Sequence, residues 1–246
     1  MKQFLTVLFV AVGILYTTSA HAVTFSGNAI GMWNDVVSTD PDDVFSVNNS
    51  DMGAFATFNW GVGGCPSCTE FDNQFTFDGI GSDGDTGWSA ASEDPFLIGD
   101  FVYRNGSTTN SFGISGVNLD IQLIILDPFE LTNIYSFAFN ITNTPNFSGD
   151  PVTDGDIVTV GSSFTDIVFE YDGVTYTLQL LGFSSDGGNT IRTDFSSPEG
   201  ATAEAGVYAR ITSEIPPPGE NPVPEPATML LLGSGLAGAF LRKKRA

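Results

Sequence analysis

Alternation of apolar and polar residues is the dominant pattern of this chain between residues 54 and 212. In segment 117–126 the odd positions are all valine, leucine or isoleucine, and Asn118, Asp120 and Gln122 lie between them. A period of two places alternate side chains on opposite faces, which predicts a half-buried β-strand. Further predicted strands are 54–60, 71–77, 96–104, 137–141, 156–160, 167–171, 175–182 and 206–212.

The turns between these segments favour antiparallel pairing. Asp172-Gly173 separates two of the predicted strands, and this dipeptide is a strong signal for a tight hairpin. No helical pattern of ten residues and no fixed repeat interrupts them. Nine or more short strands in this length predict an all-β fold, an antiparallel two-sheet β-sandwich of the jelly-roll-like kind.

Both ends of the chain differ from this β-rich body. Residues 1–22 read as a secretory signal peptide, with Lys2 before an apolar run and an Ala-x-Ala site at Ala20 and Ala22, so cleavage is predicted before Val23. The body then covers residues 23–212, and a proline-rich, unpatterned segment, 213–223, predicts an extended spacer.

Residues 224–246 complete the chain with three successive features. Pro224, Glu225 and Pro226 precede a 15-residue apolar run, 227–241. The run is shorter than the ~20 residues that a membrane-spanning helix usually needs. Four basic residues follow it: Arg242, Lys243, Lys244 and Arg245. Such a cluster stays on the cytoplasmic side, which predicts that the body lies outside the inner membrane.

This tail resembles the PEP-CTERM sorting signal of Gram-negative bacteria. The resemblance implies recognition by an exosortase and cleavage near the proline-glutamate-proline triplet, after transient anchoring in the inner membrane through the short helix. A plain C-terminal membrane anchor is the alternative.

The body also resembles a known family, the choice-of-anchor domains, in the type called K. The segments that carry the resemblance are 96–106, Thr144-Pro145-Asn146, the hairpin 171–183 and Ser197-Pro198-Glu199. The resemblance implies a β domain displayed at the bacterial surface. It brings no catalytic residues.

Charge and histidine content restrict the chemistry. All 29 acidic residues lie between residues 23 and 226, where the basic residues are Arg104, Arg192 and Arg210, so this part carries a net charge of about −26. Such a field repels nucleic acid, and we expect no nucleic-acid partner. The one histidine, His21, belongs to the signal peptide, which excludes histidine-dependent catalysis and ordinary zinc sites from the body.

Cys65 and Cys68 form a CxxC pair within a Gly/Pro/Ser-rich segment. An exported chain meets an oxidising compartment, so we expect a local disulfide that closes a tight turn. A redox centre is the alternative, and it would usually require a helix N-terminus next to the cysteines.

Carboxylates and tryptophans provide the candidate ligand sites. Asp83 and Asp85 are the preferred candidates for calcium, the one cofactor we consider, because hard oxygen ligands on loops suit that ion. Clusters at 40–43 and 150–156 are further possibilities, although none completes an EF-hand. Trp88 lies in a Gly/Asp/Ser-rich stretch and is the tryptophan expected to be exposed for ligand binding, whereas Trp33 and Trp60 are expected in the core.

Three functions are compatible with these features. The favoured one is a non-enzymatic, exported, surface-sorted protein of the cell envelope or of an exopolysaccharide or biofilm matrix, with an exosortase, the secretion machinery and an exopolysaccharide as partners. The second is a carbohydrate-binding module. The third is a carboxylate-based glycosidase, which needs two facing carboxyl groups.

The calcium hypothesis predicts a saturable stabilisation of the exported protein. Its melting temperature should rise between micromolar and millimolar calcium and then level off, because an ion bound to the folded state stabilises it by mass action. Magnesium at equal ionic strength is the control. Equal shifts with both ions would leave only screening of the negative charge.

Overall fold

The computed structural model describes residues 23–49, 55–81, 84, 86–161 and 167–214. These residues form thirteen strands in two antiparallel sheets. In spatial order the six-stranded sheet contains β12 (Asp194–Ser197), β9 (Asp156–Val160), β8 (Leu131–Thr142), β7 (Ile114–Asp127), β1 (Thr24–Ser38) and β5 (Trp88–Ala91). The seven-stranded sheet contains β10 (Ile167–Tyr171), β11 (Val174–Ser184), β13 (Thr202–Glu214), β6 (Pro95–Arg104), β4 (Asn73–Gly79), β3 (Phe55–Trp60) and β2 (Phe45–Asn48).

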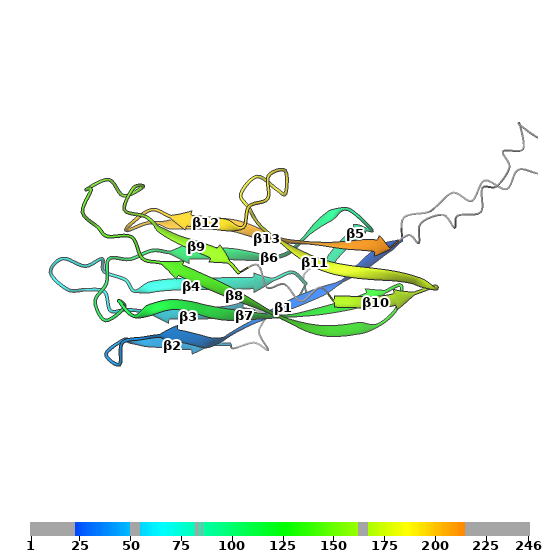
Figure 1. The fold of residues 1–246 in the computed structure, drawn as a ribbon, viewed down its shortest axis with the longest axis horizontal. Helices are drawn as coiled ribbons and strands as arrows, with labels where there is room; N and C mark the ends of the chain where they lie inside the picture. Colours follow the sequence, from blue (N-terminus) through cyan, green and yellow to red (C-terminus); the bar gives the residue numbers. More distant parts are fainter. Residues whose placement is uncertain (1–22, 50–54, 82–83, 85, 162–166, 215–246) are drawn as a thin grey trace, which may run out of the picture.

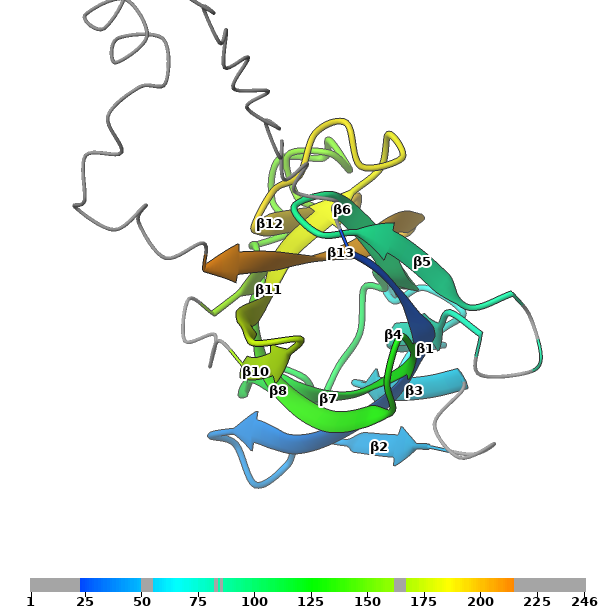
Figure 2. The same cartoon turned by 90° about the vertical axis from the view of Figure 1, so that its right-hand side faces the viewer.

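The two sheets curl and pack face to face around one core, as the end-on view shows (Figure 2). The chain passes repeatedly between them, for example from β4 to β5 and from β6 to β7. The predicted all-β sandwich is therefore confirmed. The hairpin prediction is confirmed too, because Asp172 and Gly173 both have positive φ between the paired residues Tyr171 and Val174.

Each of the nine predicted segments overlaps a strand, although segment 71–77 begins two residues before β4, and the sequence did not reveal β1, β2, β5 and β12. Three of these have only four residues, too few for a period to stand out. The fourth, β1, is the longest strand in the described residues. Its inward positions include Gly27, Ala29 and Gly31, which are small, while larger Ile30 and Met32 point outward. Because several buried side chains of β1 are smaller than the outward-facing ones, the sequence of β1 does not show the usual alternation of large apolar and polar residues.

Trp33 on β1 joins the two sheets at the centre of the core. Its side chain is 1% exposed, and its indole Nε1 donates a hydrogen bond of 3.1 Å to the carbonyl of Ala56 in the opposite sheet. Its ring lies 5.6 Å from Phe75 of the opposite sheet and 5.3 Å from Phe139 of its own sheet, centroid to centroid. Aromatic pairs at such separations stabilise a core beyond their buried area.

Close packing around Phe77 explains two glycines in the strands. A Cβ atom on Gly31 would lie 2.2 Å from Phe77 Cδ1, and one on Gly99 would lie 2.3 Å from Phe77 Cζ. Gly31 belongs to the sheet opposite Phe77, and Gly99 pairs with Gly79 on the neighbouring strand. The absence of both Cβ atoms therefore makes room for the ring between the sheets.

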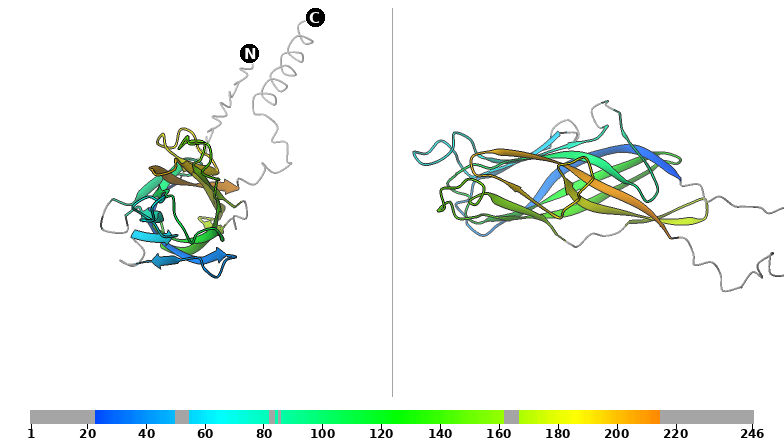
Figure 3. Two further views of the ribbon diagram at one scale, coloured as in Figure 1. Left: turned by 90° about the vertical axis from the view of Figure 1, so that its left-hand side faces the viewer. Right: turned by 90° about the horizontal axis from the view of Figure 1, so that it is seen from above.

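The two ends of the sandwich differ in the loops that they carry. Loops 39–44, 61–72, 105–113, 143–155 and 198–201 gather at one end, called here the loop pole (Figures 1 and 3). Backbone hydrogen bonds connect them, such as Thr69 N to Ser107 O and Asn105 N to Ala201 O, both 2.9 Å. Val23 and Glu214 lie at the opposite end, the terminal pole. There, Ser92 N donates to Val23 O at 2.8 Å, and Glu93 N donates to Ile211 O at 2.7 Å.

Adding one methyl group between the sheets should measurably destabilise the protein. We expect Gly31→Ala to reduce the free energy of unfolding by about 1–3 kcal/mol, because the Phe77 ring must move in a close-packed core. Urea denaturation of the purified protein measures this change. Gly161→Ala is the matched control, since a Cβ there meets its nearest neighbours at an ordinary 3.5 Å. Equal losses in the two variants would contradict the packing explanation.

Candidate functional site

Several predicted site residues lie outside the described residues. They are the sorting-signal residues Pro224, Glu225, Pro226, Arg242, Lys243, Lys244 and Arg245, the signal-peptide residues Ala20 and Ala22, and the preferred calcium ligands Asp83 and Asp85. Val23, the residue after the predicted cleavage site, is the first described residue.

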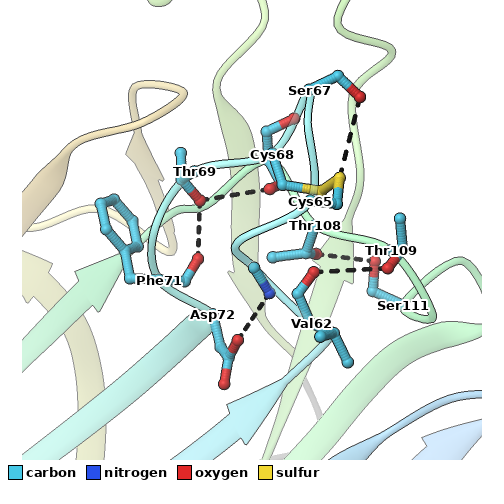
Figure 4. The surroundings of a disulfide bond; sticks show 12 residues. Val62, Cys65, Ser67, Cys68, Thr69, Phe71, Asp72, Thr108, Thr109 and Ser111 are labelled. Atoms are coloured by element: carbon cyan, nitrogen blue, oxygen red, sulfur yellow. Dashed lines mark hydrogen bonds between the residues drawn. A yellow bond between two sulfur atoms is a disulfide. The ribbon is translucent and has the colours of Figure 1, made fainter.

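Cys65 and Cys68 are joined by a disulfide at the tip of loop 61–72 (Figure 4). The turn between them is closed by a hydrogen bond of 2.9 Å from Cys68 N to Cys65 O. Asp72 accepts a hydrogen bond of 2.8 Å from Gly63 N across the base of the loop. Strand β4, not a helix, follows the loop, so the helix N-terminus that usually accompanies a redox CxxC is missing here. This arrangement favours a structural bond.

The prediction that Trp88 is exposed is wrong, and with it the proposed ligand-binding role. Trp88 is 4% exposed, and its ring stacks on Phe96 with 4.5 Å between centroids. It begins strand β5, where it pairs with Gly27, rather than continuing the preceding loop. Pairing therefore turns the side chain into the core. Trp33 and Trp60, both 1% exposed, are core residues as expected.

The acidic clusters of the loop pole hold loops together. Asp43 accepts hydrogen bonds from Ser38 Oγ at 2.6 Å and Gly113 N at 3.2 Å. Asp154 accepts from the backbone N–H groups of Ser148 and Gly149, both at 3.0 Å, and the hydrogen bonds from Ser148 lower its pKa. In the described part of the chain, no three histidine, cysteine, aspartate or glutamate side chains are grouped to hold a metal ion.

Asp156 is a buried carboxylate in the same pole. It is 6% exposed, and the Tyr103 hydroxyl donates to its Oδ2 at 3.0 Å. Its Oδ1 accepts from the backbone N of Thr144 at 2.8 Å. Burial raises the pKa of Asp156, while these hydrogen bonds partly oppose the rise. Nearby, the pKa of Glu199 is raised first by burial and then by the charge of Asp156.

The candidate functional site is a groove on the outer face of the seven-stranded sheet. It has a volume of about 460 Å³. The lining residues include Leu97, Asp100 and Val102 from β6, and Glu204 and Tyr208 from β13. Asp100 pairs with Gly206, so Glu204 lies diagonally across from it on the same face. The loop that follows β11 rises beside this face and forms its wall (Figure 1).

Local hydrogen bonds fix that loop. Ser184 Oγ donates to Asp186 Oδ1 at 2.7 Å, and Thr190 N donates to the same oxygen at 2.8 Å. These contacts lower the pKa of Asp186, with the bond from Thr190 contributing most. Phe183 and Arg192 exchange backbone hydrogen bonds of 2.7 and 2.9 Å at the base of the loop. The conformation of the groove wall is therefore set by hydrogen bonds within the loop itself.

Two carboxylates, those of Asp100 and Glu204, line this groove together with the ring of Tyr208. Partial burial and then the charge of Glu204 raise the pKa of Asp100. Burial, followed by the charges of Asp100 and Asp186, raises the pKa of Tyr208. No sequence pattern indicates this site, because its residues come from three separated segments, and those on β6 and β13 fit ordinary strand alternation.

No helix in the described residues has the length and hydrophobicity needed to cross a membrane. Comparison with known protein families identifies a motif at the C-terminal end of the chain. Residues 222–245 match the PEP-CTERM protein-sorting motif. This motif implies an exported protein, anchored in the membrane through its C-terminal signal until an exosortase processes it. No curated protein matches the chain.

The buried charge of Asp156 predicts a specific pH dependence of stability. A carboxyl group whose folded pKa is raised contributes stability that is present below its unfolded pKa, near 3.9, and is lost as the pH rises through the folded value. We therefore expect the stability of the wild type relative to Asp156→Asn to increase as the pH falls from 7 toward 4. Urea denaturation across this range measures it. Asp150→Asn, an exposed neighbour, is the control, and equal pH profiles for all three proteins would contradict the prediction.

Proposed function

We propose that this chain is a non-enzymatic protein sorted to the bacterial surface, where it serves the cell envelope or an exopolysaccharide or biofilm matrix. The match of residues 222–245 to the sorting motif carries the proposal, since it implies export and exosortase processing. The resemblance of the body to the choice-of-anchor domains supports surface display. The exosortase acts on the tail, and an exopolysaccharide is the proposed partner of the body.

The position of the chain ends supports display of the sandwich. Glu214 ends β13 at the terminal pole, and the matched motif begins eight residues later. A fully extended chain of that length spans at most about 28 Å. The terminal pole is therefore tethered close to the sorting motif, and the loop pole can face away from it. Phe112 and Phe147, 81% and 92% exposed, lie on loops of that free pole, where a partner can reach them.

A carboxylate-based glycosidase, the third of the functions considered, needs two neighbouring carboxyl groups, and Asp100 and Glu204 line the same groove. Both side chains are exposed. A general acid in such enzymes usually has its pKa raised toward the working pH by a water-poor pocket. The pKa of Asp100 is raised, but its side chain and that of Glu204 are exposed on an open sheet face, which suits binding better than proton transfer. We therefore favour a non-enzymatic role.

Intact-mass analysis of the protein from the host surface tests the sorting function. We expect a mature chain that ends near Glu225 or Pro226 and lacks Arg242 to Arg245, because a 15-residue helix rises only about 22 Å against a ~30 Å hydrocarbon core. Replacement Glu225→Ala should leave export intact while the uncleaved form accumulates in the inner membrane.

Glu220→Ala is the matched control for this experiment, since it removes an acidic residue from the spacer and not from the triplet. Its product should have the mature mass. A surface protein that keeps its basic C-terminus would show that the tail is a plain anchor, and the sorting proposal would fail.

A further inference from the structure

We propose that the groove on the seven-stranded sheet binds a neutral polysaccharide chain, with Tyr208 as its stacking platform. This inference rests on the proposed function and names the chemistry of the matrix partner. It replaces the carbohydrate-binding role first assigned to Trp88, which is buried.

The shape of the site suits an extended ligand. Beside the groove of about 460 Å³ lies a second hollow of about 220 Å³. Ser184, Ser185 and Ala205 line both, so the two hollows adjoin. A compact metabolite would fill one of them, whereas a linear chain can occupy both in succession. The smaller hollow is also lined by Phe195 of the six-stranded sheet, so the groove continues past the sheet face toward β12. Two adjoining hollows therefore favour a polymer.

Glycines hold the platform in place. A Cβ atom on Gly188 would lie 2.7 Å from Tyr208 Cε1, and one on Gly206 would lie 2.9 Å from Cε2. The backbone thus comes close to the ring at two places, which larger residues would prevent. An aromatic side chain held in this way loses little conformational freedom when a ligand packs against it. Leu97 and Val102 extend the apolar surface around the ring.

Polar groups around the ring set the ligand class. Asp100 and Glu204 are acceptors for sugar hydroxyl groups, and the hydroxyls of Ser184 and Ser185 can donate or accept. None of the described residues that line the larger hollow is basic, and Arg192 in the smaller hollow is accompanied by Asp186 and Asp194. These carboxylates repel uronic acids, sulfated sugars and phosphates. A neutral sugar can stack its apolar C–H face on the ring of Tyr208 and donate hydrogen bonds from its hydroxyl groups to the carboxylates.

Saturation-transfer NMR of the purified exported protein with cellopentaose, maltopentaose and chitopentaose tests the proposal. We expect at least one of these probes to receive saturation on its ring C–H groups. Tyr208→Ala should weaken binding at least about tenfold, because central aromatic anchors carry much of a binding energy. Tyr208→Phe keeps the ring and should bind within about threefold of the wild type. Glu204→Gln should weaken binding without loss of fold.

Phe55→Ala is the matched control, because Phe55 is a 49% exposed aromatic on the outer face of the same sheet, three strands from Tyr208. It should bind like the wild type, and thermal melting verifies that each variant is folded. Absence of binding by all three probes overturns the inference, as does binding of pentalysine or polygalacturonate in their place. Neither result affects sorting. Hydrolysis of a bound probe would instead contradict the non-enzymatic role.

Discussion

The packing of Trp33 across the two sheets is the interaction on which the rest of this structure depends. Its indole ring contacts aromatic residues of both sheets, and its N–H group is bonded to the opposite sheet through Ala56. The preceding inward-facing residue on β1, Gly31, must be small, because Phe77 fills the space over it. One bulky anchor and adjacent glycines thus set the separation of the sheets.

Several of the many carboxylates of this protein serve as hydrogen-bond acceptors that hold its loops in place. Asp43, Asp154 and Asp186 each accept backbone N–H groups within or next to their own loops. An acceptor used in this way replaces water that the N–H group would otherwise bind. The acidic clusters at 40–43 and 150–156, which the sequence suggests as calcium ligands, therefore order loops at the loop pole, and Asp186 orders the loop beside the groove.

The chain ends and the groove lie at different places on the sandwich. Both ends of the described body leave from the terminal pole, and the matched sorting motif follows after a short segment. The groove lies on the side of the sandwich, between residues of β6, β13 and the loop after β11, away from the line between the poles. A ligand along the sheet face would not compete with the tether.

The sequence by itself determined nine of the thirteen described strands, the Asp172-Gly173 hairpin and the sorting motif, because alternation, turn chemistry and short linear signals are local properties. Only the tertiary structure decided the role of β1, whose glycines conceal its period, and the burial of Trp88, which follows from its pairing with Gly27. The groove also belongs to the tertiary structure. Asp100, Glu204 and Tyr208 come from β6 and β13, and the register between these strands, which no local pattern encodes, brings them to one face.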